Sequence, residues 1–199
     1  MQRLLTAERA ELACDPTLAT ARALLEAYLP RDAEQARFRR EMLEFLEAHP
    51  EDAHRRSCVP GHLTASSVVV DRSRGRALLT HHKKLERWLQ LGGHCDGDSN
   101  LPAVALREAR EESGLDELVI DPRIVDLDIH VIPARPGSGP GRPGEPEHLH
   151  LDARFLIHAP AGARETASAE SHRLAWISPA ELESIEADDS LRRLFRLAF

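Results

Sequence analysis

The chain has 199 residues, of which 42% are hydrophobic and 30% charged, and its formal net charge is −7. This composition is typical of a soluble globular protein that is long enough to bury a hydrophobic core. The negative charge argues against general nucleic-acid binding through phosphate neutralisation, so we expect no stable nucleic-acid partner. It does not argue against small anionic substrates, because a bound metal ion can reverse the local sign of the charge.

Three cysteines and the N-terminal residues indicate where the protein is located. Cys14, Cys58 and Cys95 are an odd number without CxxC spacing, which suggests neither a disulfide framework nor a cysteine zinc site. Charged residues such as Arg3 and Glu8 interrupt the N-terminal leucines, so there is no signal-peptide core, and no apolar run approaches the length of a membrane span. We therefore expect a cytoplasmic protein without a membrane partner.

Residues 1 to about 50 have the pattern of amphipathic helices. The segment "TLATARALLEAYLP" places Leu18, Leu25 and Leu29 near one face and stops at Pro30. A second segment begins at Asp32, a good N-cap, and carries apolar residues at helical spacing up to Pro50: Phe38, Met42, Phe45 and Leu46. The sequence predicts a helical extension over residues 1–56, packed on a domain over residues 57–199 or on a second subunit in a homodimer.

Strand patterns begin near Pro60. "TASSVVVD" and "RGRALLTHHKK" are separated by a turn at residues 73–75 and predict a hairpin, and "ERWLQLGGH" predicts a short strand that ends in a glycine turn. Further strands are predicted in "ELVIDPRIVDLDIHVIPA", "HLHLDARFLIHA" and "HRLAWISP", and "SLRRLFRLAF" predicts a closing helix. The proline- and glycine-rich residues 133–147 predict an exposed loop. Strands around a central helix indicate a mixed-sheet α/β or α+β domain.

The segment "REAREESGL", residues 107–115, lies on that central helix. Ser99 or Asn100 can cap the helix, and Gly114 fits its left-handed exit. Glu108 shares a helical face with Glu111 and Glu112, and like charges at these spacings cost about 0.2–0.5 kcal/mol per pair. Such a face is either solvated surface or a site for a divalent cation with oxygen ligands.

The longer segment "GHCDGDSNLPAVALREAREESGL", residues 93–115, resembles the Nudix box, G-x5-E-x7-R-E-U-x-E-E-x-G-U with U an aliphatic residue. The positions that match are Gly93, Arg107, Glu108, Glu111, Glu112, Gly114 and Leu115, with Ala109 at the first U. With its flanking strands the resemblance covers about residues 60–185, and "ESHRLAWISPAEL" is similar to the usual close of a Nudix domain. It implies an α+β fold, the α/β/α sandwich with a mixed sheet.

The resemblance also implies roles for individual residues. It makes Glu108, Glu111 and Glu112 ligands of Mg2+ or Mn2+, with Glu108, Glu111 and Arg107 in the catalytic machinery. Arg107 would orient a glutamate through a charge-assisted hydrogen bond. Of Glu165 and Glu170, which lie before the last strand, we choose Glu170 as the general base. The metal would shield the charge of a small-molecule diphosphate substrate and activate a water.

Two positions depart from the box. It has glutamate where this chain has Ser99, and the residue before the paired glycines, usually proline, is Leu91. Asp96 or Asp98 could replace the missing carboxylate through a shifted loop, or Ser99 serves as the helix N-cap. The metal-binding glutamates are retained.

A second polar cluster follows two strands. "DLDIH" aligns Asp126, Asp128 and His130 on one face, and "HLHLD" aligns His148, His150 and Asp152. The two segments could pair as an antiparallel hairpin around the proline-rich loop, with His94 joining them as a further metal ligand. The cluster either binds a transition metal, because imidazole favours Mn, Zn or Fe over Mg, or hydrogen-bonds phosphate. Chance alternation on a solvent-facing strand is the simpler explanation for either segment alone.

Other candidate residues have an ordinary explanation as well. His82 and Lys83 could capture phosphate, although most such basic runs are solvated turns. Trp88 and Trp176 are expected in the core by their apolar surroundings, and Cys95 is expected to be a small packing residue.

The sequence leaves three functions open. The first is a metal-dependent hydrolase that cleaves a diphosphate linkage in a nucleoside diphosphate derivative or related small molecule. The second is isomerase chemistry on a diphosphate, as in the isopentenyl-diphosphate isomerases that share the Nudix scaffold, although their cysteine nucleophile motif is not evident. The third is a non-catalytic Nudix-fold nucleotide-binding module. The first is the prediction that we adopt.

Overall fold

A seven-stranded sheet forms the centre of the protein, in a computed structural model that describes residues 4–73, 75–82, 86–137, 144–166 and 171–199. Its strands are β1 (Gly61–Asp71), β2 (Arg76–His82), β3 (Arg87–Leu89), β4 (Leu91–His94), β5 (Val119–Ile132), β6 (His148–His158) and β7 (Ser171–Ile177). The order is β3-β2-β1-β6-β5, with β4 paired to β1 and β7 paired to β2. β1 and β6 are parallel and the other pairs antiparallel, so the sheet is mixed as predicted.

Helices cover both faces of this sheet. In β1, Leu63 and Val69 belong to the apolar cluster that contains helix α3 (Leu101–Ser113), whereas Val68 and Val70 belong to the cluster that contains helix α5 (Asp189–Ala198). This alternation follows the two-residue period of a strand. The α/β/α sandwich with a mixed sheet is therefore confirmed, and a short helix, α4 (Pro179–Leu182), precedes α5.

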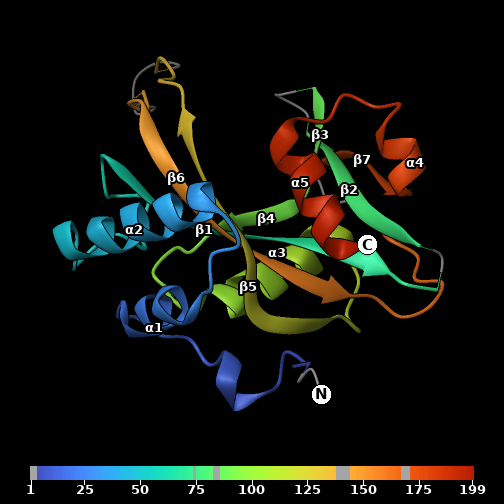
Figure 1. Ribbon diagram of the computed structural model, residues 1–199, viewed down its shortest axis with the longest axis horizontal. Helices are drawn as coiled ribbons and strands as arrows, with labels where there is room; N and C mark the ends of the chain where they lie inside the picture. Colours follow the sequence, from blue (N-terminus) through green and yellow to red (C-terminus); the bar gives the residue numbers. More distant parts are fainter. Residues whose placement is uncertain (1–3, 74, 83–85, 138–143, 167–170) are drawn as a thin grey trace.

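The N-terminal residues form two helices, and less of the segment is helical than predicted. After a 3-10 turn, η1 (Ala10–Leu12), come α1 (Ala19–Ala27) and α2 (Ala33–Ala48), which lie together on the opposite side of the molecule from α4 and α5 (Figure 1). Asp32 caps α2 as predicted, accepting the Gln35 N–H at 2.8 Å. The expectation that residues 1 to about 50 are helical throughout is wrong, because Leu5 forms a β-bridge with Ile120. Leu29 lies beyond the end of α1 and is 87% exposed, so it does not share the buried face of Leu25.

The extension shares its apolar core with the rest of the chain. Leu25, Met42 and Leu46 are fully buried, and they belong to the same apolar cluster as Leu63 of β1 and Ile120 of β5. The division at residues 56 and 57 remains a prediction about folding units.

Two glycines lie inside a strand rather than in the predicted turn. "ERWLQLGGH" forms β3 and β4, and Gly92 and Gly93 pair with Ser66 and Ala65 of β1. A Cβ on Gly92 would lie 2.4 Å from the Cβ of Ser66, so the close approach of β4 to β1 requires glycine. Gly114 ends α3 in the left-handed conformation at φ 67°, as predicted.

The predicted hairpins are present. β1 pairs with β2 and β5 pairs with β6, and the chain crosses from β5 to β6 through the proline-rich segment. In that segment Arg135 and Glu145 form an isolated bridge, and residues 138–143 lie outside the described residues. In the described part of the chain no helix is long and apolar enough to cross a membrane.

Candidate active site

A cleft of about 740 Å3 lies between α3 and the strands β1, β4 and β6. Most of the predicted site residues line it: His94, Arg107, Glu108, Glu111, Glu112, His130, His148, His150 and Asp152. Asp128 is not among its lining residues. Glu170 and Lys83 lie outside the described residues, and so does the side chain of His82.

The glutamates reach the cleft from one face of α3. Glu108 is partly buried, with 19% of its side chain exposed, whereas Glu111 is exposed. Glu112 accepts the backbone N–H of Gly92 at 2.9 Å, which fixes this carboxylate against β4. The three- and four-residue spacing of the helix thus brings three carboxylates to one wall, as the sequence predicts.

Gly93 makes room for Glu108. A Cβ at this position would lie 2.3 Å from Oε2 of Glu108, closer than side-chain atoms approach one another. The box glycine is therefore needed for the position of the carboxylate and not for a turn, because Gly93 lies within β4.

Arg107 holds the wall of the cleft together. One guanidinium nitrogen donates to Oε1 of Glu108 at 2.8 Å and to the carbonyl oxygen of His94 at 3.0 Å. The hydrogen bond to Glu108 is the orienting contact that the sequence predicts. Through the second contact, Arg107 also links α3 to the end of β4.

Burial has an electrostatic cost at Glu108. Burial raises the pKa of this carboxyl, the Arg107 hydrogen bond and charge lower it, and the charge of Glu111 raises it again; the net pKa is above the usual value. A carboxylate in such surroundings is stabilised by a further positive charge. The donor set of the wall, three carboxylates, is the set that Mg2+ and Mn2+ prefer.

Ser99 does not cap α3, contrary to one of the two explanations for it. Neither Ser99 nor Asn100 makes a side-chain capping bond to the helix. The Ser99 hydroxyl instead donates to Oδ2 of Asp15 at 3.2 Å, and its N–H donates to the Asp15 carbonyl at 2.8 Å. Ser99 is fully buried, so the box position that usually carries glutamate is here used to attach the N-terminal segment.

The two neighbouring aspartates are also engaged. Asp96 forms a bidentate pair with Arg56, at 2.8 and 2.9 Å. Oδ1 of Asp98 accepts the backbone N–H groups of Asp15 and Asn100, at 3.0 and 2.9 Å. The loop between β4 and α3 is thereby fixed to residues before the sheet.

The predicted pairing of the two polar strand segments is confirmed. His130 of β5 lies opposite His150 of β6, and Asp128 lies opposite Asp152. His130 and Asp128 are themselves joined by a hydrogen bond of 3.0 Å. Residues opposite each other in a sheet share a face, so the pairing gathers these side chains.

The two aspartates of this cluster have other partners. Asp152 is buried and accepts hydrogen bonds from Thr64, Ser66 and Arg154, at 2.9, 2.6 and 2.9 Å. Burial would raise the pKa of Asp128, but the His130 hydrogen bond and the Arg154 charge lower it well below its usual value. The Asp128 carboxylate therefore stays ionised within the sheet.

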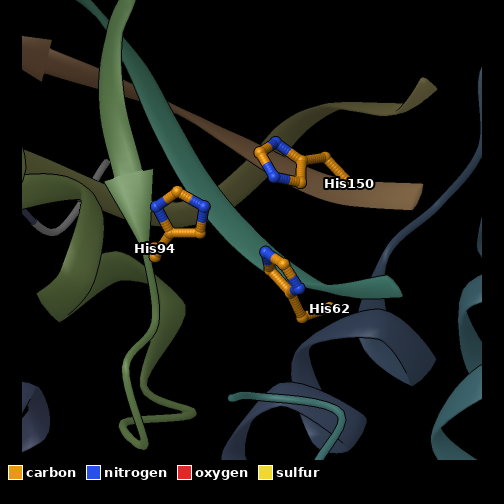
Figure 2. A group of neighbouring side chains, drawn as sticks. All are labelled: His62, His94 and His150. Carbon is orange, nitrogen blue, oxygen red and sulfur yellow. The ribbon is translucent and has the colours of Figure 1, made fainter. Parts of the chain in front are cut away.

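Three histidines are grouped on neighbouring strands of the sheet. Figure 2 shows the rings of His62, His94 and His150, from β1, β4 and β6, around a common space. Their ring centroids are 5.1 Å apart for His62 and His94, 4.9 Å for His62 and His150, and 5.0 Å for His94 and His150. His148 adds a fourth ring, stacked on His62 at 5.0 Å.

His62 is the member that sequence reasoning missed. It comes at the start of β1, away from the histidine-rich segments, and reaches the cluster because β1 pairs in parallel with β6, His62 opposite His150. A histidine directly after a glycine that opens a strand was the only local signal.

Burial lowers the pKa of all three rings. Burial, and after it the charge of Arg56, lower the pKa of His94 to about 4. Burial, and after it the electrostatic effects of the neighbouring His94 and His130, lower the pKa of His150 to about 2. Burial and His148 lower the pKa of His62. The rings are neutral near pH 7.

The remaining predicted residues lie outside this centre. Trp88 is buried in the apolar cluster that contains α5. Trp176 is partly buried against the apolar cluster that contains α3, and its ring N–H donates to Glu165 at 2.6 Å. Cys95 is 1% exposed and burial raises its pKa, as expected of a packing residue.

The fold agrees with comparisons to known proteins. The NUDIX domain model matches residues 61–198. A dihydroneopterin triphosphate pyrophosphohydrolase from E. coli is 16% identical, with a TM-score of 0.52, and the match covers 67% of this chain and 92% of that one. An Ap4A hydrolase from C. elegans is 17% identical, also with a TM-score of 0.52, over 68% of this chain and 93% of that one. No curated protein matches the sequence. The chain belongs to the NUDIX domain family and has the fold of its pyrophosphohydrolases.

Proposed function

We propose that the protein is a metal-dependent hydrolase that cleaves the diphosphate linkage of a nucleoside diphosphate derivative or a related small molecule. The observation that carries the proposal is the glutamate wall of α3, with Glu108, Glu111 and Glu112 lining one cleft beside Arg107. Family membership supports the same chemistry, because both of the structural relatives named above are hydrolases.

Glu108, Glu111 and Glu112 would hold Mg2+ or Mn2+. The raised pKa of Glu108 and the oxygen-only donor set fit such a hard cation. When bound, the cation neutralises phosphate charge and lowers the pKa of a coordinated water, which supplies the nucleophile.

The chain's own residues prepare the cleft. Arg107 keeps one oxygen of Glu108 engaged, and Gly93 leaves space for the other. The N–H of Gly92 holds Glu112. Arg56 and Arg135 also line the cleft, paired with Asp96 and Glu145, and their guanidinium groups are the donors there that an anionic substrate would use.

The test is hydrolysis of a panel of nucleoside diphosphate derivatives, with Mg2+ and Mn2+ supplied separately. We expect turnover with at least one compound and a loss of about 100-fold or more in kcat for Glu111→Gln. Glu117→Gln is the matched control, because Glu117 is exposed just after α3 and does not line the cleft.

Two results would contradict the proposal. If compounds bind without being cleaved, the protein is a binding module on the same fold. If Glu117→Gln lowers kcat as much as Glu111→Gln, the loss reflects general damage and not removal of a metal ligand.

A further inference from the structure

The histidine cluster has the composition of a second and chemically different metal site. Its nitrogen donors come from three adjacent strands and not from α3. In the described part of the chain, one ring nitrogen each from His62, His94 and His150 lies within 4.8 Å of the other two. A tetrahedral zinc ion with Zn–N bonds of about 2.0–2.1 Å holds its ligand nitrogens roughly 3.3 Å apart, so each pair of nitrogens has to approach by no more than about 1.5 Å.

The sheet register brings these rings together. His62 lies directly opposite His150 in the parallel β1–β6 pair, and His94 lies opposite Thr64, two residues beyond His62 on the other edge of β1. Residues two apart on a strand share a face, so β1 presents His62 between the two partner strands. Three ligands on paired strands have little freedom to move apart, which favours a preformed site.

His62 is buried without a hydrogen bond of good geometry. It is 2% exposed, and neither ring nitrogen makes such a bond with any described residue, although the Cys58 backbone is close enough to act on the ring. Buried polar groups are normally hydrogen-bonded, and an exception needs a physical reason. A metal ion would use the lone pair that the neutral ring carries.

The neighbouring His148 is held by its own contacts beside this group. Its Nδ1 donates to the Pro146 carbonyl oxygen at 2.9 Å. Its Nε2 is buried, makes no hydrogen bond with any described residue, and lies 3.8 Å from Oε1 of Glu145. A ring fixed through a backbone carbonyl is the arrangement commonly found around metal ligands.

We propose that His62, His94 and His150 bind one transition-metal ion, of which Zn2+ and Fe2+ are the expected kinds, at a site separate from the carboxylates of α3. Neutral imidazole prefers these borderline ions to Mg2+. We assign His94 to this site and not to the carboxylates. His94 and His150 line the cleft while His62 lies buried, so a fourth coordination position faces the cleft. Three protein ligands with one open position are typical of catalytic and not of structural zinc.

The spacing of the ring nitrogens supports a metal over a phosphate group. One nitrogen from each ring lies within 4.8 Å of the other two, and the neutral form of imidazole is the one that ligates metals. This inference does not depend on the proposed function, because it concerns nitrogen donors that hydrolysis by a carboxylate-bound cation does not require.

The first experiment is calorimetric titration of chelator-treated, full-length protein with Zn2+. We expect one Zn2+ ion to bind tightly per chain. His94→Gln and His150→Gln should each lower the Zn2+ affinity by more than about 100-fold, which exceeds the loss caused by removing a residue that only hydrogen-bonds a metal ligand. His158→Gln is the matched control, since His158 lies on β6 but not in the cleft. Glu111→Gln should also retain the Zn2+ site, which separates this inference from the proposed function.

X-ray absorption at the zinc edge of the loaded wild-type protein tests the ligands without relying on a variant. We expect three imidazole nitrogens at about 2.0 Å. A shell of oxygens only, equal Zn2+ affinity in wild type and His150→Gln, or loss of the site in Glu111→Gln would each overturn the proposal.

Discussion

Gly93 leaves the space into which the Glu108 carboxylate reaches. In Gly93→Ala the new Cβ would lie 2.3 Å from Oε2, and the carboxylate must move because its end is the flexible part. Since misplacement of a catalytic group by about 1 Å can cost 100-fold, we expect kcat to fall by about that factor with little change in melting temperature. Steady-state kinetics together with thermal unfolding measure both.

The comparison that isolates this effect is Glu108→Gln. If Gly93→Ala acts by displacing Glu108, it should add little to the loss already caused by Glu108→Gln, because coupled residues are not additive. Independent, additive losses would show that Gly93 acts through something other than Glu108.

Ser99 is a second residue at which a family pattern and the structure differ. Glutamate at this fully buried position would meet Asp15 and Asp98, both of which already bond this loop. We expect Ser99→Glu to lower the free energy of unfolding by about 1–3 kcal/mol through overpacking, with further loss from like charges, and not to raise kcat.

Ser99→Ala is the companion variant, because it removes only the 3.2 Å hydrogen bond to Asp15 and should cost about 0.5–1.5 kcal/mol. Urea denaturation of both variants measures the difference. A gain in kcat for Ser99→Glu would mean that the box carboxylate is missing from catalysis in the wild type.

At the scale of elements, Arg154 joins β6 to β5 and α5. Its guanidinium, almost completely buried, contacts Asp126 at 3.2 Å, Asp128 at 3.1 Å and the Ser190 hydroxyl at 2.6 Å. Breaking a buried charge pair costs about 3–5 kcal/mol because it leaves a buried charge uncompensated. We expect a loss of that size in Arg154→Leu, measured by denaturant unfolding.

Arg40→Leu is the matched substitution on the surface. Arg40 pairs with Glu44 at 3.7 Å on α2, and both side chains are more than 60% exposed. Such a pair contributes about 0.3–0.5 kcal/mol. If both substitutions lower the free energy of unfolding by the same amount, water stabilises the aspartates around Arg154 after the substitution, and Arg154 does not hold these elements together.

The site elements differ in how far the sequence predicts them. Alternation of polar residues in "DLDIH" and "HLHLD" predicted the pairing of His130 with His150, because a hairpin forms between neighbouring segments. The spacing of the glutamates predicted the wall on α3, because a helix is local. His62 was missed, because the parallel pairing of β1 with β6 joins segments about 90 residues apart and has no local pattern.

The N-terminal residues show a related limit. Their apolar spacing predicted α1 and α2 but also suggested helix before residue 19, where Asp15 instead bonds to Ser99 and Leu5 to Ile120. Those contacts are with residues distant in the sequence. The buried Ser99 of the box loop is explained only by its hydrogen bond to Asp15. Propensity is a weak prior when such tertiary contacts compete with it.

At the scale of the whole molecule, residues 1–56 and the sheet form one apolar core. Leu25, Met42 and Leu46 are fully buried in the cluster that also contains α3, so deleting the extension would expose that side of the core to water. We expect residues 57–199 alone to lack a cooperative unfolding transition and to bind a hydrophobic dye. The full-length chain should unfold in one transition, with circular dichroism and tryptophan fluorescence changing together.

Met42→Ala tests the same claim without truncation. Removing this buried side chain should cost about 2–5 kcal/mol and shift the single transition as a whole, including the signal from Trp88 on the far face of the sheet. If the extension folded as an independent unit, the substitution would move only an early phase and leave the tryptophan transition in place. A stable, cooperative fragment of residues 57–199 would then be expected as well, and the cleft would not depend on the N-terminal helices for its shape.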